Sequence, residues 1–323
     1  MGDPAGIGPE VLLKALQSPA VRALGDLIVL GDAAVLRRTA ESLHLECPYP
    51  VTPIATPIEE LARGIAIWDF ANASDVPPGE ASREGGEASL QYVNRAIDLA
   101  LTGKIDAIVT GPINKQALLM SGANWPGHTE LLAQRTRTKH PVMMLAGERL
   151  RVALVTTHAA LKKVPALLTT DGVLATIRVT DRSLKELFGI ERPRLAVCGL
   201  NPHASDGGRF GTEEAKIIEP AIRKAQAAGI EATGPHPADV IFHQAAAGRY
   251  DAVVAMYHDQ GLIPLKLLHF EDAVNVTLGL PIIRTSVDHG TAYDIVGRGV
   301  ASAGSMIAAL RLAAQLAQRR GKK

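Results

Sequence analysis

The sequence predicts an α/β fold with a largely parallel sheet, because apolar runs of strand length alternate with segments of helical periodicity. The chain has 323 residues, which is too long for one small domain and indicates two. Hydrophobic residues make up 47 % of it, enough to bury a sizeable core. We therefore expect layered α/β domains.

The expected elements follow in chain order. Strands are predicted at 27–30, 106–110, 142–146, 150–155, 194–200, 251–256 and 274–278. Helices are predicted over the segment after Asp32 as far as Leu43, and over 89–101, 212–228, 238–247 and 302–318. The turn 147–149 between two apolar runs predicts a hairpin and hence a mixed sheet. The stretch 74–86, rich in Pro, Gly and Ser, predicts a loop.

Charge and cysteine content exclude several classes of protein. The 34 basic and 33 acidic residues give a net charge of +1, so neither nucleic acid nor an anionic membrane is expected as a partner. Cys47 and Cys198 do not form a disulfide framework and fit a reducing cytoplasm. No apolar run reaches the ~18–20 residues that span a bilayer. The first residues do not resemble a signal peptide, so we expect a cytoplasmic protein.

A glycine-rich segment, GDPAGIGPE, occupies 2–10 and leads into an apolar helical run at 11–16. Pro9 suits the first turn of a helix, and Glu10 suits its positive end. Such a loop lets an anion approach a helix N-terminus. An ordinary tight turn explains it equally well, and the spacing is not that of a dinucleotide fingerprint. A loop of this kind normally follows a strand, so either the chain begins late or the sheet lacks its first strand.

Histidines follow three of the predicted strands. His158, His203 and His258 each come after the carboxyl end of a strand, where open α/β sheets place ligands. Three neutral imidazoles with one open position suit Zn²⁺ or a similar ion, and Asp259 could act as ligand, support or base. A hydrogen-bonded structural role explains any single histidine as well.

Anion-binding side chains are predicted at two places. Thr129, after His128, either caps the helix that begins there or binds a carboxylate or phosphate. Lys266, Asn275 and Arg284 follow the third histidine. Arg284 is predicted at a strand end, and its guanidinium suits bidentate recognition of phosphate. Solvated surface charge is the alternative for each basic residue.

Taken together, these segments resemble the PdxA family of 4-hydroxythreonine-4-phosphate dehydrogenases. The matching motifs are GDPAGIGPE at 2–10, TGPINK at 110–115, GHTE at 127–130, TTH at 156–158, GLNPHA at 199–204, GTEE at 211–214, AMYHDQG at 255–261, NVTLGLPIIRTSVDHGTA at 275–292 and GRG at 297–299. They span nearly the whole chain in the family's order. GIGPE at 6–10 and HGTAYDIVGRG at 289–299 also resemble the isocitrate and isopropylmalate dehydrogenases.

The resemblance implies the isocitrate/isopropylmalate dehydrogenase-like fold, with two α/β domains and a cleft between them. It implies a cofactor-binding domain at 1–118 with 271–323, and a domain for metal, substrate and dimerisation at 119–270. The implied metal ligands are His158, His203 and His258, shared between the subunits of a homodimer, with zinc, magnesium or cobalt as the ion. The implied substrate contacts are His128, Thr129, Lys266, Asn275 and Arg284. The implied NAD or NADP contacts are His289, Gly290, Thr291, Ala292 and Asp294.

The implied activity is oxidation of 4-phosphooxy-L-threonine, followed by decarboxylation to 3-amino-2-oxopropyl phosphate in pyridoxal phosphate biosynthesis. Lys266 and Asp259 are both candidates for the base. A sister group similar to this family oxidises 4-phospho-D-threonate or 4-phospho-D-erythronate, and the motifs leave that alternative open. Two rivals come from other classes: a metal-dependent hydrolase, in which the histidines activate water, and a non-catalytic ligand-binding protein of two α/β domains.

Overall fold

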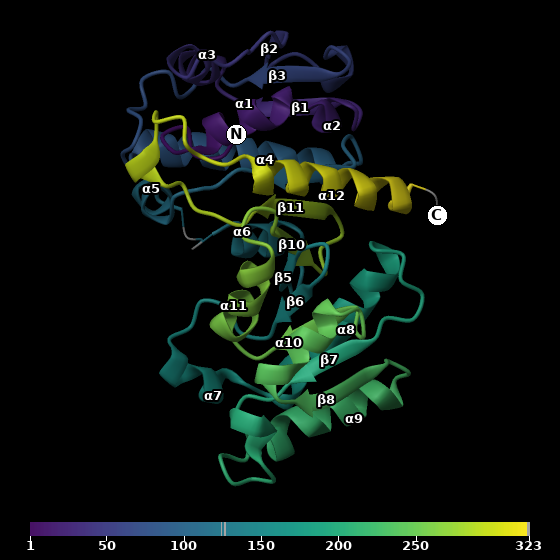
Figure 1. Ribbon diagram of the computed structural model, residues 1–323. Helices are drawn as coiled ribbons and strands as arrows, with labels where there is room; N and C mark the ends of the chain where they lie inside the picture. Colours follow the sequence, from purple (N-terminus) through teal and green to yellow (C-terminus); the bar gives the residue numbers. More distant parts are fainter. Residues whose placement is uncertain (124, 126, 322–323) are drawn as a thin grey trace. The chain divides into compact units, whose positions relative to one another are not determined.

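A computed structural model describes residues 1–123, 125 and 127–321 (Figure 1). The chain divides into two compact units. Unit 1 comprises Met1–Arg137 and Pro281–Ala317, and unit 2 comprises Thr138–Leu280 with the C-terminal residues from Gln318. Both are α/β, so the predicted fold class is confirmed. The functions assigned above to the two sequence domains stay predictions.

Unit 1 contains two groups of parallel strands. Strands β1 (Leu27–Gly31), β3 (Ile65–Asp69) and β2 (Val51–Pro53) form a parallel sheet in the order β1-β3-β2, while β4 (Ala107–Thr110) pairs in parallel with β11 (Ile283–Val287). Its helices are α1 (Gly8–Gln17), α2 (Pro19–Arg22), α3 (Ala33–Ser42), α4 (Arg83–Leu101), α5 (Lys115–Met120), α6 (His128–Arg135) and α12 (Gly304–Arg320), with short 3₁₀ turns at Ile58–Glu60 and Tyr293–Ile295.

The core of unit 1 joins the two ends of the chain. Leu12 and Leu16 on α1 belong to the same buried cluster as Met306 and Leu310 on α12. Figure 1 shows these helices in purple and yellow. Burial of such side chains contributes about 1.5–3 kcal/mol each. The C-terminal segment that carries the predicted cofactor residues is therefore fixed against the N-terminal glycine loop.

Unit 2 is built on a mixed sheet. The strands β5 (Val142–Ala146), β6 (Arg151–Leu154), β7 (Leu195–Cys198), β8 (Ala232–His236), β9 (Ala252–Ala255) and β10 (Val274–Leu278) lie in the order β10-β5-β6-β9-β7-β8. The predicted hairpin is confirmed, because β5 pairs antiparallel with β6. Strand β9 is parallel to both β6 and β7. The helices are α7 (Val164–Leu167), α8 (Thr170–Glu186), α9 (Glu219–Ala227), α10 (Ala238–Ala246) and α11 (His258–Leu268), with 3₁₀ turns at Leu161–Lys163 and Pro202–Ser205 and a π-helical turn at Glu214–Ile218.

Two predicted boundaries are wrong. The loop expected at 74–86 ends earlier, because α4 begins at Arg83, where the Ser82 side chain caps the helix by accepting from Gly85 N. The helix expected at 212–228 is a π-helical turn followed by α9. The sequence analysis also missed the strands β2, β3 and β8 and the helices α2, α5, α7, α8 and α11. Strand β2 has three residues, and β8 contains Gly and Pro, which are depleted in strands.

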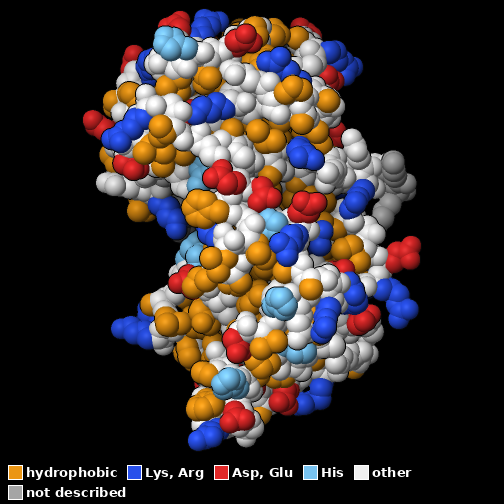
Figure 2. Space-filling view, in the orientation of Figure 1, with side chains coloured by type: hydrophobic (Ala, Val, Ile, Leu, Met, Phe, Trp, Pro, Cys, Tyr) orange, Lys and Arg blue, Asp and Glu red, His pale blue; other side chains and the backbone are white. Residues whose placement is uncertain are grey.

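The surface and the cysteines agree with the composition. Basic and acidic side chains are interspersed over the face shown in Figure 2. Cys47 and Cys198 are both free. Among the residues described, no helix combines the length and apolar character needed to cross a membrane.

Candidate active site

The three predicted metal-ligand histidines follow three neighbouring parallel strands of unit 2. His158 comes after β6, His203 lies in the turn after β7, and His258 is the first residue of α11, directly after β9. The strands lie side by side in the order β6-β9-β7. Because they are parallel, their carboxyl ends meet at one edge of the sheet, the usual place for a ligand in an open α/β sheet.

His158 and His258 lie together at this edge. Their ring centroids are 5.7 Å apart, with the rings tilted by 42°. The parallel pairing of β6 with β9 continues past both strands, since Thr156 donates from N and from Oγ1 to Met256 O, the latter at 2.7 Å. This extension brings the two histidine-bearing loops into register.

Asp259 orients one of these rings. Its Oδ1 lies 2.7 Å from His258 Nδ1. A carboxylate on Nδ1 fixes the tautomer with the proton on that atom and leaves Nε2 as the nitrogen able to bind a metal. The geometry therefore favours a supporting role for Asp259.

The turn that carries His203 is held by two acidic residues. Glu214 accepts hydrogen bonds from Leu200 N and Asn201 N, and Glu213 accepts one from Asn201 Nδ2. The bond from Asn201 lowers the pKa of Glu213. Gln260 links this turn to α11, because its Oε1 accepts from Met256 N and its Nε2 donates to Gly199 O, both at 2.7 Å.

The donor set suits a divalent metal, although one chain does not complete it. Imidazole nitrogens are ordinary ligands of Zn²⁺, and the bond from Asp259 is the support that a metal-binding histidine usually has. Within the described ranges, no three His, Cys, Asp or Glu side chains are grouped closely enough to hold an ion. The structure thus brings His158 and His258 together but does not add His203 to them.

Arg284 is the most deeply placed of the predicted substrate residues. It is the second residue of β11, so its prediction as a strand-end residue is wrong. Its side chain is buried, and Nη2 donates to Thr110 Oγ1 on β4 at 2.7 Å. Burial lowers the pKa of Arg284 to about 9, which leaves the guanidinium positively charged at neutral pH. It therefore offers a desolvated positive charge to an anion.

His128 and Thr129 begin α6, also in unit 1. Gly127 is the residue before the first helical turn, so the alternative in which Thr129 caps the helix is wrong. His128 Nε2 is buried and has no hydrogen-bond partner among the described residues. Burial, with the positive charge of Arg284, holds the pKa of His128 well below its usual range. A neutral imidazole with an unsatisfied nitrogen beside a helix N-terminus fits contact with an anionic ligand.

Lys266 and Asn275 lie in unit 2. Lys266 is on α11, two turns after His258, with Nζ 5.9 Å from the centre of the Phe270 ring. Asn275 is in β10, opposite Leu145 of β5. Both side chains are half-buried.

The predicted cofactor residues form a turn after β11 that packs on the N-terminal glycine loop. Ile7 N donates to Thr291 O at 2.9 Å, and a Cβ on Gly6 would lie 2.9 Å from Thr291 Cβ. Only glycine allows this close approach. Tyr293 Oη donates to Asp3 Oδ2 at 2.5 Å, and Ala292 has a left-handed backbone with φ 42°. His289 Nε2 is buried without a partner in the described part of the chain, as a ligand-binding nitrogen would be.

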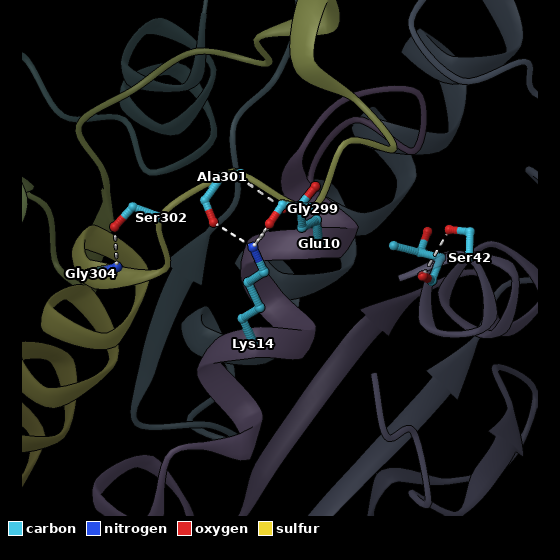
Figure 3. A network of polar contacts seen from close by, with 8 residues as sticks. Glu10, Lys14, Ser42, Gly299, Ala301, Ser302 and Gly304 are labelled. Carbon is cyan, nitrogen blue, oxygen red and sulfur yellow. Dashed lines mark hydrogen bonds and ion pairs between the residues drawn. The ribbon is translucent and has the colours of Figure 1, made fainter. Parts of the chain in front are cut away.

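A buried glutamate fixes the far end of this turn (Figure 3). Glu10 Oε1, on the first turn of α1, accepts from Ala301 N at 3.0 Å and from Lys14 Nζ at 2.7 Å. Lys14 Nζ also donates to Gly299 O and Ala301 O, both at 2.8 Å. The segment from the predicted cofactor residues to α12 is therefore fastened to α1.

Comparison with known proteins decides the family. The sequence profile described as pyridoxal phosphate biosynthetic protein PdxA matches residues 23–313. The chain belongs to the PdxA family. A 4-hydroxythreonine-4-phosphate dehydrogenase from Trichlorobacter lovleyi is 49 % identical over 99 % of this chain and 97 % of its own length. The crystal structure of the Klebsiella pneumoniae 4-hydroxythreonine-4-phosphate dehydrogenase matches with TM-score 0.88 and 43 % identity, over 98 % of this chain and 96 % of that one.

Another relative carries a different substrate in its name. A protein from Symbiobacterium thermophilum, provisionally described as D-threonate 4-phosphate dehydrogenase, is 44 % identical over 98 % of this chain and 95 % of its own length. The PdxA fold is therefore shared by proteins named for two phosphorylated substrates.

Sequence reasoning missed the residues that hold the PdxA motifs in place. Glu214 and Gln260 stood within quoted motifs but received no structural role, and Glu10 was assigned only to the positive end of its helix. Their partners lie 13, 61 and 291 residues away along the chain. A buried acid or amide at a loop is the only signal that could have pointed to them.

Proposed function

We propose that this chain is an NAD(P)- and divalent-metal-dependent dehydrogenase that oxidises 4-phosphooxy-L-threonine at C3. One observation carries the proposal: a chain that matches 4-hydroxythreonine-4-phosphate dehydrogenases over its whole length places histidines after three adjacent parallel strands. The hydrolase and ligand-binding alternatives explain the histidines or the fold, but neither explains this likeness over the full length.

The phosphate binds unit 1. Arg284 supplies a desolvated positive charge, and His128 with Thr129 supplies donors at the start of α6. A neutral His128 donates from Nε2 to a phosphate oxygen. Asn275 and Lys266 are the remaining proposed contacts to polar groups of the substrate.

The chemistry removes a proton from the C3 hydroxyl and a hydride from C3, which turns the alcohol into a ketone. A cation at His158, His203 and His258, such as zinc, magnesium or cobalt, supplies Lewis-acid chemistry that lowers the pKa of a substrate hydroxyl. Asp259 keeps Nε2 of His258 free for it. With Asp259 in this role, Lys266 accepts the hydroxyl proton. NAD or NADP would be held by His289, Gly290, Thr291, Ala292 and Asp294, and would supply the acceptor for the C3 hydride.

The product of this step is a β-keto acid. 2-Amino-3-oxo-4-phosphooxybutanoate loses CO₂ from the carbon next to the new ketone and gives 3-amino-2-oxopropyl phosphate. The chain's own residues contribute orientation and charge stabilisation. This activity places the protein in pyridoxal phosphate biosynthesis in the cytoplasm.

The working form is a homodimer that shares its metal sites. Helix α11, which begins with His258, exposes Ile263, Leu267 and Phe270 by 60 %, 81 % and 78 %. Their i, i+4, i+7 spacing puts them on one face of the helix and the following turn. An apolar stripe of this kind marks an interaction surface. A second copy seated there brings its His203 toward the His158–His258 pair.

Complementation between subunits tests the shared site. His203→Ala and His258→Ala homodimers each lack both complete sites, but a dimer of one of each has one intact site in two. Random remixing makes half of the dimers mixed, so about a quarter of wild-type activity returns. A mixture of His158→Ala and His258→Ala is the matched control. It recovers no activity, because one subunit supplies both of these histidines to each site. No recovery in either mixture would exclude sharing, and equal recovery in both would assign His258 to the other subunit from His158 and His203.

NAD reduction with two substrates tests the activity itself. 4-Phosphooxy-L-threonine and 4-phospho-D-threonate are compared side by side, each with and without added zinc. Metal-dependent turnover of the amino acid alone is expected. Turnover of the threonate alone moves the protein to sugar-acid catabolism, the second candidate that the Symbiobacterium relative supports, with 4-phospho-D-erythronate as a further substrate. Phosphate release without NAD reduction would favour a hydrolase.

A further inference from the structure

The loop that carries His203 has an unusual backbone. Positive φ angles run through six successive residues, from His203 (53°), Ala204 (50°), Ser205 (77°) and Asp206 (46°) to Gly207 (67°) and Gly208 (98°). Left-handed backbone is unfavourable for residues with a Cβ and normally occurs singly. Four such residues in a row persist only where the surrounding structure holds them, and residues of this kind cluster at functional sites.

The carboxylate of Glu214 holds the entrance to this left-handed turn. Its Oε1 accepts from Leu200 N at 2.8 Å and Asn201 N at 2.7 Å, and its Oε2 accepts from Asn201 Nδ2 at 2.9 Å. Glu214 is only 2 % exposed. All three donors are uncharged, and within the described chain no Lys, Arg or His pairs with this carboxylate. The negative charge is therefore stabilised by the amides that it orients.

Two glycines let the parts of the loop come this close. A Cβ on Gly199 would lie 2.9 Å from Ala204 Cα and 3.2 Å from Glu214 Oε1. A Cβ on Gly211 would lie 2.5 Å from both Asn201 Nδ2 and Glu213 Oε2. Ser205 Oγ closes the loop by donating to Gly211 O at 2.6 Å. The loop 199–214 is thus a packed unit centred on the Glu214 carboxylate.

We propose that Glu214 is the positioning residue for His203: its carboxylate fixes the amides of Leu200 and Asn201, and so presents His203 for metal binding before the metal arrives. The proposal rests on the proposed function, because it takes His203 as a metal ligand. A preorganised ligand loses less conformational entropy on binding. Glu214 therefore acts on metal affinity, whereas a purely structural glutamate acts only on the stability of unit 2.

The test is metal binding by the chelator-stripped, full-length protein. Zn²⁺ and Co²⁺ are titrated into wild type, Glu214→Gln and a control, Glu219→Gln, with heat and the cobalt absorption spectrum as readouts. The glutamine keeps the size of the side chain but places an NH₂ group against N–H donors whichever way the amide turns. We expect affinity about tenfold to hundredfold lower in Glu214→Gln, the range for residues that support a metal ligand. Glu219, at the start of α9, pairs with exposed Arg223, and its variant should bind as wild type does.

Hydrogen exchange gives a readout that does not depend on metal. In Glu214→Gln the amides of residues 200–206 should exchange faster while those of β7 and β9 stay protected. If Glu214→Gln does not fold, Asn201→Ala serves instead. It removes the bonds from Asn201 Nδ2 and keeps both backbone donors to Glu214, so a loss of affinity of about tenfold or less is expected.

The possible outcomes separate this inference from the proposed function. Wild type that binds neither ion overturns the metal dependence of the proposed function. Wild type that binds metal, with His203→Ala unable to bind and Glu214→Gln binding with wild-type affinity, overturns the role of Glu214 alone. A weaker Glu214→Gln with unchanged melting temperature supports it most directly.

Discussion

Two buried glutamates, one in each unit, fasten a loop in different ways. Glu10 and Glu214 are both 2 % exposed, and each accepts a backbone amide of the loop that it holds. Glu10 shares its charge with Lys14, which itself reaches two loop carbonyls. Glu214 is satisfied by uncharged donors only. The segment 289–301, proposed to bind cofactor, is therefore held by an ion pair, and the histidine loop 199–214 by amide dipoles.

The difference indicates how each loop responds to substitution. An ion pair with several further bonds loses its contacts in steps, because Glu10 keeps Ala301 N when Lys14 is replaced. The three bonds that the Glu214 carboxylate accepts all come from Leu200 and Asn201 at the entrance to the left-handed turn, so its replacement disturbs them together. We expect graded effects on cofactor binding in unit 1 and larger effects on metal binding in unit 2.

The largest effect is expected from His203→Ala, which removes a ligand from the loop held by Glu214. Activity should fall by about a thousandfold or more, because loss of a Lewis acid costs several kcal/mol of transition-state stabilisation. Zinc content, NAD reduction and the melting temperature are measured together, and the melting temperature should hold. His243→Ala, at an exposed histidine on α10, is the control. Full turnover by metal-stripped His203→Ala would contradict the assignment of the metal site.

Arg284→Met tests unit 1 away from both loops. The methionine removes the guanidinium and with it a buried charge-assisted hydrogen bond, worth about 1.5–3 kcal/mol. KM for the phosphorylated substrate should rise about tenfold to hundredfold, with KM for NAD unchanged. Arg63→Met, which removes an exposed arginine paired with Asp26, is the control. An increase in KM for NAD alone would move Arg284 from the substrate site to the cofactor site.

Lys14→Met probes the ion-paired glutamate directly. It removes one ion pair and two bonds to the loop carbonyls, each worth about 0.5–1.5 kcal/mol. We expect KM for NAD to rise about threefold to tenfold at unchanged kcat, measured by steady-state NAD reduction. Lys185→Met breaks a matched i,i+4 pair with Asp181, 2.8 Å against 2.7 Å, and should leave KM unchanged. The same shift in both variants would show a general loss of stability.

The smallest effect concerns the pH dependence of stability. Burial and the charge of Arg284 lower the pKa of His128 in the folded protein. Below the ordinary histidine pKa of about 6.5, the unfolded chain therefore binds a proton at this residue that the folded chain does not bind. Stability should therefore fall as pH drops below about 6.5, and less so in His128→Asn. Melting temperatures at about pH 7.5 and about pH 5.5 compare the two proteins. Buried histidines elsewhere contribute equally to the pH dependence of both proteins. The same fall in melting temperature in wild type and His128→Asn would show that His128 does not cause it.

Local signals in the sequence determined the fold class and the order of the main elements. Short continuous apolar runs indicated β4, β7 and β9 and the β5–β6 hairpin, because a strand that is buried on both faces is apolar at successive residues. Alternating apolar and polar residues indicated β10. The position of each histidine after a strand was also local information. The start of α4 and the position of Arg284 were predicted wrongly because the boundary of an element depends on single residues. The Ser82 cap sets the start of α4, and β11 begins one residue before Arg284.

Only the tertiary structure decided which strands are neighbours and what holds the loops. The order β6-β9-β7 places His258 between the other two histidine-bearing strands, although β7 precedes β9 in the chain. The bonds of Glu10 to Ala301 and of Gln260 to Gly199 join residues far apart in sequence. The spacing of such pairs follows no helical or strand period, so the sequence alone does not predict them. They exist because a buried carboxylate or amide must find partners, and folding supplies those partners from whichever segment packs beside it.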